Sequence, residues 1–302
     1  DGGGFYAATA ATATNTVRNC VFMANTVGGS SGGFYIADGD YMFLYNCSFT
    51  NNMAGAGSGG GLWVNGTFVN TVVTNCSFEG NRCDDLGGGA RFENGTNMTV
   101  GNCVFYNNNA VDLNAVAETE RAGGLYIGNP SVAMYSCVFT NNTTTNDQGG
   151  AVYIAGGDTG SYGFTNCQFL ANGGSASAGG AVDIENGTSF IFENCRFVTN
   201  TANDAGCVYL NCNDSPSVRF ANCQFTNSIA RTGSGGAIYL VNTFASVTIT
   251  NCPFKANKAD NYGGAVYTGN GTSMSVLDCF FDDNDATNLD GTPEASERGG
   301  AL

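Results

Sequence analysis

The sequence predicts an all-β solenoid, in which one short structural unit is stacked many times along an axis. A pattern close to Asn-Cys-x-Phe-x-x-Asn occurs ten times, and its cysteines are 27 to 34 residues apart. A near-constant period of this size indicates a repeat architecture. The chain also has 45 glycines but only 10 basic residues in 302, and this shortage of helix-forming side chains argues against a helical repeat. The motif cysteines are Cys20, Cys47, Cys76, Cys103, Cys137, Cys167, Cys195, Cys223, Cys252 and Cys279.

Each unit begins with a glycine-led segment. Examples are GGAVYI at 149–154 and GGAIYL at 235–240. Apolar and aromatic residues that follow a glycine pair in this way are typical of a short strand.

The second segment is a strand that ends at the motif cysteine, as in SVTITNC at 246–252. The residue three positions before each cysteine is always apolar, and the residue two positions earlier is mostly apolar. This period of two indicates a strand with one buried face. The inward residues nearest the cysteines are Val17, Leu44, Val73, Val100, Met134, Phe164, Phe192, Phe220, Ile249 and Val276.

The third segment contains the cysteine, the phenylalanine and the second asparagine. The period of two slips by one residue at the first asparagine, which indicates that the chain bends there, because Asn tolerates the left-handed backbone region. We expect the second asparagine to turn another corner. In a parallel stack, equivalent residues lie ~4.8 Å above one another, which predicts rows of Cys, Phe and Asn. Buried corner amides could then hydrogen-bond along the stack.

The joint recurrence of GGAI-type and FxxN segments, over essentially the whole chain, resembles the polymorphic outer membrane protein (Pmp) repeat. This resemblance implies a right-handed, single-stranded parallel β-helix of about ten coils. We expect residues 1–302 to form one continuous β-helix segment. Because the chain starts and stops inside a motif, we expect it to be a fragment of a longer repeat protein whose flanking repeats continue the stack.

The resemblance also bears on location and partners. Members of this family are typically cell-surface adhesins or passenger domains, which implies an extracellular or cell-surface location and a protein or glycan partner. A net charge of −15 disfavours nucleic acid as a partner. No apolar run approaches the ~20 residues of a membrane span, so we expect no transmembrane segment in this piece, although the parent chain could be membrane-anchored.

The first candidate site is an exposed aromatic row. In each glycine-led strand the residues flanking one position are apolar, so the side chain between them is expected to point outward. Such a row could stack on sugar rings or pack on a partner; alternatively, Tyr is simply a good strand residue that stacks on its neighbours. The candidate binding residues are Tyr35, Trp63, Tyr126, Tyr153, Tyr209, Tyr239 and Tyr267, and Tyr6, Arg91 and Asp183 occupy the remaining positions.

Two longer loops form the second candidate. Residues 109–122 and 285–298 lie six coils apart, and both end in a Glu-containing stretch with Arg before the glycines. Insertions in solenoids often bind a partner, but surface loops also tolerate insertions at low cost.

The third candidate is N-glycosylation, which would make the chain a glycoprotein. The sequence Asn-Gly-Thr follows a glycine-led strand four times, and ordinary turn chemistry explains the same residues. Asn46 and Asn75 also begin acceptor sequences, but we expect these corner side chains to be buried and unmodified. The candidate acceptors are Asn65, Asn94, Asn186 and Asn270.

Catalysis is the weakest hypothesis. The chain has no histidine, which excludes the Ser-His and Cys-His nucleophile pairs. Acidic residues occur together at different points of the repeat and without a row of basic partners. We therefore expect solvated surface charge, no catalytic or metal residues, no cofactor, and at most weak Ca²⁺ binding. The groups are Asp38 and Asp40; Asp84 and Asp85; Asp183 and Glu185; and Asp282, Asp283 and Asp285.

Thirteen cysteines raise the question of disulfides. Stacked neighbours ~4.8 Å apart exceed the ~3.5–4.5 Å between Cβ atoms that a disulfide needs. We expect the ten motif cysteines to be buried, reduced and unreactive.

Two hypotheses of function follow. The first is a non-enzymatic structural or adhesive rod at the cell surface, which serves adhesion, surface coating or filament building. The alternative is a carbohydrate-active β-helix, either a polysaccharide lyase or hydrolase or a glycan-binding module, with the aromatic row as its groove. Acids gathered beside Arg or Lys on one face of the coils would favour the alternative, and we expect none.

Overall fold

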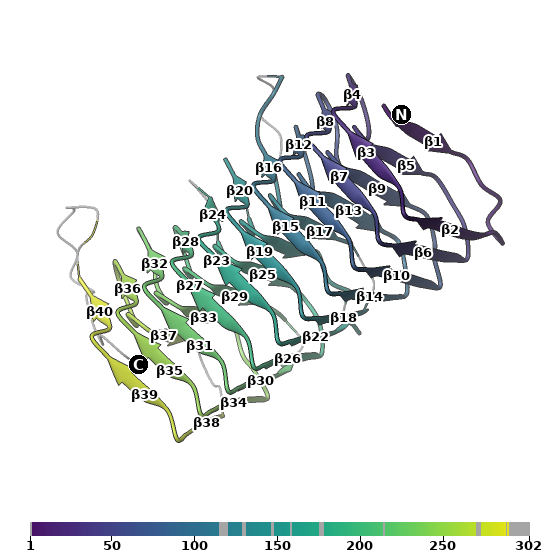
Figure 1. Cartoon of the computed structure of the whole chain (residues 1–302). Helices are drawn as coiled ribbons and strands as arrows, with labels where there is room; N and C mark the ends of the chain where they lie inside the picture. Colours follow the sequence, from purple (N-terminus) through teal and green to yellow (C-terminus); the bar gives the residue numbers. More distant parts are fainter. Residues whose placement is uncertain are drawn as a thin grey trace.

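The computed structural model describes residues 2–114, 120–128, 131–145, 148–157, 159–174, 178–213, 215–269, 273–287 and 289. Within these ranges the chain forms forty short strands in four parallel ten-stranded sheets, and no helix. Each coil contributes one strand to each sheet, so ten coils stack along one axis, with the first and the tenth coil at opposite ends (Figure 1). This confirms the predicted stack of about ten coils. No helix in the described ranges is long and apolar enough to cross a membrane.

The glycine-led segments form sheet A, and the segments that end at the motif cysteines form sheet B. Sheet A contains β1 (Phe5–Ala7), β5 (Phe34–Ile36), β9 (Leu62–Asn65), β13 (Ala90–Glu93), β17 (Leu125–Ile127), β21 (Val152–Ile154), β25 (Val182–Glu185), β29 (Val208–Asn211), β33 (Ile238–Val241) and β37 (Val266–Thr268). Sheet B contains β2 (Thr14–Arg18), β6 (Tyr41–Tyr45), β10 (Asn70–Thr74), β14 (Asn97–Gly101), β18 (Ser131–Tyr135), β22 (Ser161–Thr165), β26 (Ser189–Glu193), β30 (Ser217–Ala221), β34 (Ser246–Thr250) and β38 (Met274–Leu277).

The phenylalanine segments form sheet C, and a short segment after each second asparagine forms sheet D. Sheet C contains β3 (Val21–Met23), β7 (Ser48–Thr50), β11 (Ser77–Glu79), β15 (Val104–Tyr106), β19 (Val138–Thr140), β23 (Gln168–Leu170), β27 (Arg196–Val198), β31 (Gln224–Thr226), β35 (Pro253–Lys255) and β39 (Phe280–Asp282). Sheet D contains β4 (Thr26–Val27), β8 (Met53–Ala54), β12 (Arg82–Cys83), β16 (Asn109–Ala110), β20 (Thr143–Thr144), β24 (Gly173–Gly174), β28 (Thr201–Ala202), β32 (Ile229–Ala230), β36 (Lys258–Ala259) and β40 (Asp285–Ala286).

Sheet D was not among the three segments that the sequence predicts for each coil. A strand of two residues cannot show a period of two, so it carries no pattern signal. Its inward position is usually a small residue, such as Ala54 or Ala110, and both of these side chains are fully buried. The strand begins at Asn109, so the predicted loop at 109–122 starts inside a strand.

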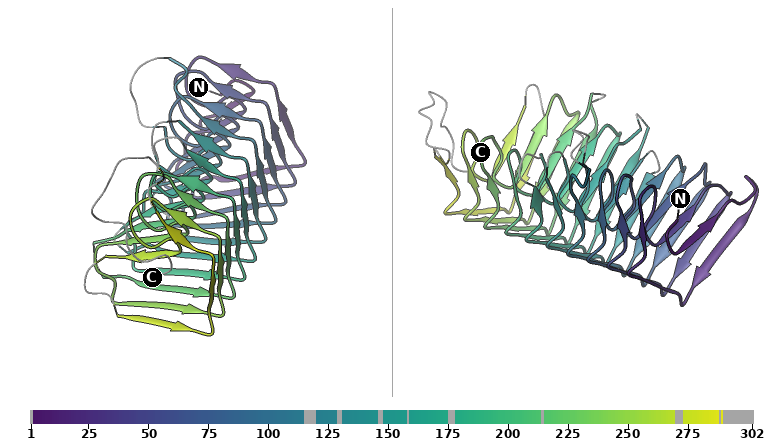
Figure 2. Two further views of the ribbon diagram at one scale, coloured as in Figure 1. Left: turned by 90° about the vertical axis from the view of Figure 1, so that its left-hand side faces the viewer. Right: turned by 90° about the horizontal axis from the view of Figure 1, so that it is seen from above.

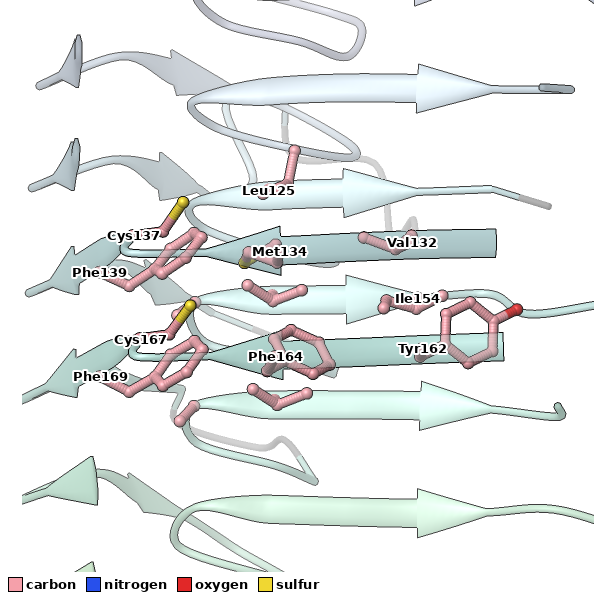
Figure 3. Close-up of a cluster of buried hydrophobic side chains, with 14 of the residues drawn as sticks. Leu125, Val132, Met134, Cys137, Phe139, Ile154, Tyr162, Phe164, Cys167 and Phe169 are labelled. Atoms are coloured by element: carbon pink, nitrogen blue, oxygen red, sulfur yellow. The ribbon is translucent and has the colours of Figure 1, made fainter. Parts of the chain in front are cut away.

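The core lies between the inward faces of the sheets. Phenylalanines from Phe22 to Phe281 form one row in sheet C, with neighbouring ring centroids 4.6 to 5.1 Å apart. Figure 3 shows the cysteine and phenylalanine of one coil lying beside those of the next. Each buried ring contributes roughly 1.5–3 kcal/mol by leaving water, so the row is a major source of stability.

The first asparagine of each motif turns the corner between sheets B and C, as predicted. All ten residues at this position have φ between 51° and 55°, including the substitutes Ser136 and Asp278. The prediction that these side chains are buried is wrong, because Asn46 and Asn75 are exposed. Since the backbone alone makes the bend, the side chain remains on its outer side.

The second asparagine does not turn the next corner, contrary to the prediction. The residue before it has the positive φ, between 52° and 63° in all ten coils. The asparagine side chain itself is buried and forms hydrogen bonds between neighbouring coils. For example, the Asn81 Nδ2 group donates to the Phe49 carbonyl and to Asn108 Oδ1, at 2.9 Å each, and the Asn81 backbone N–H donates to the same Oδ1 at 3.0 Å. This row satisfies backbone groups that would otherwise be buried without partners.

The two glycines that precede a strand of sheet A are needed for different physical reasons. Gly149 has φ of +70°, and a Cβ atom there would lie 2.7 Å from the Val152 carbonyl oxygen. At Gly150 the backbone of the next coil is close, since a Cβ atom would lie 2.3 Å from the Gly180 oxygen. The first glycine is therefore needed for its conformation and the second for tight stacking of coils.

Candidate functional site

The predicted outward row lies on sheet A. The central residues of its strands pair directly with one another from coil to coil, for example Tyr35 with Trp63 and Tyr209 with Tyr239. None of these central residues belongs to the main apolar core, which confirms that their side chains point away from it. We call these ten residues, from Tyr6 to Tyr267, the outer row.

The first part of the outer row is a continuous stack. The rings of Tyr6 and Tyr35 are 5.3 Å apart and nearly parallel, and the Tyr35 and Trp63 rings are 5.2 Å apart and perpendicular. The Arg91 guanidinium lies 4.4 Å from the Trp63 ring and 5.4 Å from the Tyr126 ring, and it forms an ion pair with Glu93. A cation between two aromatic rings holds the row together where an aromatic residue is missing.

The middle of the outer row is not exposed, and here the prediction is wrong. Tyr153 is completely buried and Tyr126 is only 9% exposed. Both pack with Ala122, the last residue of the 109–122 loop, in a small apolar cluster separate from the main core. These tyrosines point outward from the coil, but a neighbouring part of the chain covers them.

Arg121 is the residue that closes this part of the row, and the sequence did not assign it a role. Its guanidinium lies 4.8 Å from the Tyr153 ring and donates a hydrogen bond of 2.9 Å to the Tyr153 hydroxyl. Burial raises the pKa of the Tyr153 phenol, the Arg121 charge lowers it, and the carboxylates of Glu185 and Asp183 raise it further. The phenol is therefore a neutral hydrogen-bonding group over the whole physiological range.

The expectation of solvated surface charge is wrong at Asp183. Asp183 occupies the outer row between Tyr153 and Tyr209 and is fully buried. Arg121 reaches the Tyr153 side of this position from its loop rather than from a strand. Repeat register alone could not place it, because loop residues have no equivalent in other coils.

The last part of the outer row is half-buried. The Tyr209 and Tyr239 rings are 5.4 Å apart and perpendicular, and the Tyr239 and Tyr267 rings are 5.0 Å apart. Tyr262 stacks on Tyr267 at 5.4 Å. Burial raises the pKa of Tyr209, and it also raises the pKa of Tyr239. The open aromatic surface is thus confined to the two ends of the row.

The two long loops are anchored in the same way. The Leu113 backbone N–H donates to the Asp84 carboxylate, and the Leu289 backbone N–H donates to Asp260. Asp84 is buried, so the expectation of a solvated charge is wrong for this residue. Leu113 and Leu289 are therefore equivalent anchor positions in the two loops. Residues 115–119 and most of 285–298 lie outside the described residues.

The candidate glycosylation sites differ in exposure. Asn94 is exposed with φ of 57°, whereas Asn186 is half-buried. Asn65 is also half-buried, and its Nδ2 group donates to the Tyr35 hydroxyl at 2.9 Å. Asn270 lies outside the described residues. Since Asn46 and Asn75 are exposed, the argument that burial keeps them unmodified no longer holds.

All thirteen cysteines are free. Eight motif cysteines are buried, and Cys20 and Cys279 in the terminal coils are half-buried. Burial raises the pKa of Cys207 and of Cys212 to about 12. Hydrogen bonding to the neighbouring thiol, together with burial, raises the pKa of Cys195 to about 12. Buried neutral thiols such as these three are poor nucleophiles, whereas hydrogen bonding with the Cys137 thiol lowers the pKa of Cys103 and of Cys167.

No group of three or more His, Cys, Asp and Glu side chains within the described ranges could hold a metal ion. Asp282 forms a surface ion pair with Lys255 at 3.1 Å. The Asn114 side-chain amide donates to Asp84, and the Ser58 hydroxyl donates to Asp85 at 3.4 Å.

These features define the class of protein as a parallel β-solenoid with regular internal rows. The family model described as a right handed beta helix region matches residues 1–129 and 114–286. The chain belongs to the right-handed β-helix family. No curated protein and no solved structure matches the chain.

Proposed function

We propose that the chain is a non-enzymatic rod at the cell surface or outside the cell, which serves adhesion, surface coating or filament building. Its repeats are proposed to be of the Pmp type, which the paired glycine-led and FxxN segments support. In this proposal the protein or glycan partner contacts the half-open ends of the outer row, Tyr35 with Trp63 and Tyr209 through Tyr267. No cofactor takes part. Exposed Asn94 is the best-placed candidate for glycosylation.

The observation that carries this proposal is the packing of the outer row. A catalytic groove needs space above its reactive groups, but the middle of the row is filled by Arg91, Tyr126, Tyr153 and Arg121. Fully buried Tyr153 contacts Arg121 rather than solvent. The remaining aromatic surface suits contact with a partner, because half-buried aromatic rings provide large contact areas at low entropic cost.

Binding and cleavage should be measured on the same samples. The chain is incubated with neutral and uronic-acid polysaccharides, and both retention and release of new chain ends are recorded. The proposal expects no cleavage, and it expects any retention to fall at least fivefold in Tyr239→Ala, with Thr140→Ala on sheet C as the matched control. Cleavage that disappears in a single carboxylate variant would overturn it.

One observation favours the alternative, a carbohydrate-active enzyme. Buried Asp183 lies between two tyrosines, with Glu185 on the same strand and Arg121 on the Tyr153 side. Acid–base chemistry on polysaccharides uses carboxylates in such settings. The variant Asp183→Asn discriminates between the two functions. If this carboxylate is catalytic, the substitution abolishes polysaccharide turnover; if the rod proposal is right, the unmodified chain shows no turnover in the first place.

A further inference from the structure

A strip of three aromatic side chains crosses the outer face of sheet B in the second coil. Tyr41, Phe43 and Tyr45 occupy the outward positions of β6, and successive ring centroids are 6.3 and 6.2 Å apart with planes within 7°. Tyr41 is 39% exposed, and the other two are half-buried. The strip belongs to neither the core nor the outer row. Aromatic groups in such positions are common at protein interfaces.

The same face of the sheet is hollowed farther along the rod. Ala133 and Gly163 occupy the central outward positions of β18 and β22 in the fifth and sixth coils, where other coils have larger side chains. The result is a hollow of about 390 Å³, bounded by Thr99, Ser131 and Ile191. The aromatic strip and the hollow therefore lie on one face, a little more than three coils apart.

This face carries little charge. The outward positions of β2, β6, β10, β14, β18 and β22 include no Asp or Glu, although the chain has 25 acidic residues. Arg18 is the one charged side chain among them. Asp40 directly precedes β6, and Glu193 is an outward residue of β26 in the seventh coil. Two molecules of charge −15 repel each other, so a face without carboxylates is where a second copy could approach.

We propose that this face binds a second copy of the chain, with the two rods antiparallel about a twofold axis that lies in the interface and runs parallel to the strands of sheet B. Such an axis places the strip of each copy opposite the hollow of the other, which makes the interface self-complementary. Phe43 enters the hollow at Ala133 and Gly163, and Tyr41 faces Ser131 and Ser161. The contacts between strip and hollow span the second to the sixth coil, so Glu193 in the seventh lies beyond them.

The size of the face predicts a weak dimer. Five residues at ~3.3 Å and six strands at ~4.8 Å give a face of roughly 16 by 29 Å. Two copies would bury on the order of 1,000 Å² in total, which is near the lower limit for specific interfaces. The proposal concerns a different face from the outer row and does not depend on the proposed function.

Sedimentation velocity over a range of protein concentrations tests the proposal. We expect a reversible monomer–dimer equilibrium. Phe43→Asp removes the strip's central ring and adds a charge, and Ala133→Trp fills the hollow, so each should weaken dimerisation at least tenfold. Thr248→Asp, on the same face in the ninth coil, should change it less than twofold. A monomer at all concentrations, open-ended oligomers, or equal effects of all three variants would overturn the proposal.

A photoreactive phenylalanine analogue at position 43 tests the register directly. Irradiation should join residue 43 of one copy to the region 131–163 of the other in the dimer. Cross-links confined to other coils would contradict the twofold arrangement. If the chain binds polysaccharide beads through this face and forms no dimer, the face is a glycan-binding surface instead.

Discussion

Two aromatic rows run along the same axis with nearly the same spacing but in different surroundings. In the inner row, from Phe22 to Phe281, neighbouring planes are within 7° of parallel. In the outer row, neighbouring aromatic rings are 5.0 to 5.5 Å apart but tilted by 2° to 90°. Arg91 and Asp183 interrupt the outer row, and the chain covers its middle.

The difference shows that a regular row of aromatics is not by itself evidence of a binding surface. Stacked repeats place equivalent residues in register whatever their role, as the parallel coils in Figure 2 illustrate. What decides the role is whether another part of the molecule covers the row. By this criterion the inner row is entirely structural, and the outer row is structural in its middle and open only at its ends.

The largest effect is expected in the inner row. Phe105→Ala removes a ring that stacks at 4.6 Å on both Phe78 and Phe139, and it should lower the free energy of unfolding by about 3–5 kcal/mol. Urea unfolding followed by circular dichroism measures this loss. Thr140→Ala on the outward face of sheet C is the control and should cost about 0.5 kcal/mol or less. Equal losses would place Phe105 at the surface.

The sequence predicted the inner row well, because one strand period and one bend residue determine it. It placed the bend at the first asparagine correctly, but it was wrong about the burial of that side chain and about a bend at the second asparagine. Both rows have the same residue type, and the pattern cannot tell a backbone bend from a buried amide. It also failed at Tyr126 and Tyr153, because the residues that cover them come from a loop without a counterpart in most coils. Arg121 is such a residue. Tertiary contacts of that kind leave no trace in repeat periodicity.

The middle of the outer row should behave like a core. Tyr153→Ala should cost about 2–4 kcal/mol, because it removes a fully buried ring and leaves the Arg121 guanidinium without its hydrogen-bond acceptor. Tyr239→Ala in the half-open part of the row is the matched control, for which we expect about 1 kcal/mol. If the two variants lose the same stability, the contrast between middle and ends is wrong.

A smaller effect is expected from the residue that covers the row. Arg121→Ala should lower stability by about 1–2 kcal/mol, the sum of a partly exposed cation–π contact and a hydrogen bond from a charged donor. Arg231→Ala is the control. The Arg231 guanidinium donates to one backbone carbonyl, and the described contacts give it no aromatic ring. Thermal unfolding of both variants provides the comparison, and an equal shift in Tm would mean that Arg121 does not hold the row closed.

The smallest effect concerns pH. Burial raises the pKa of Tyr126, Tyr153 and Tyr209 in the folded chain, whereas an unfolded phenol titrates near ~10. These phenols therefore contribute full stability below pH ~10, and that contribution is lost as pH rises through their higher folded values. Ultraviolet titration should show some of the 13 tyrosines ionising near ~10 and others only on unfolding. A single transition near ~10 in the folded protein would contradict this.

Residue-resolved nitration of tyrosine under native conditions tests the central claim most directly, because the reagent reports access to each ring. The account predicts rapid modification of Tyr35, Tyr239 and Tyr267, and protection of Tyr126 and Tyr153 to the level of Tyr162, which is buried in the main core. Peptide mass spectrometry over a time course gives the individual rates. Modification of Tyr153 as fast as Tyr239 would show that the whole outer row is open, and the account of a closed middle would be wrong.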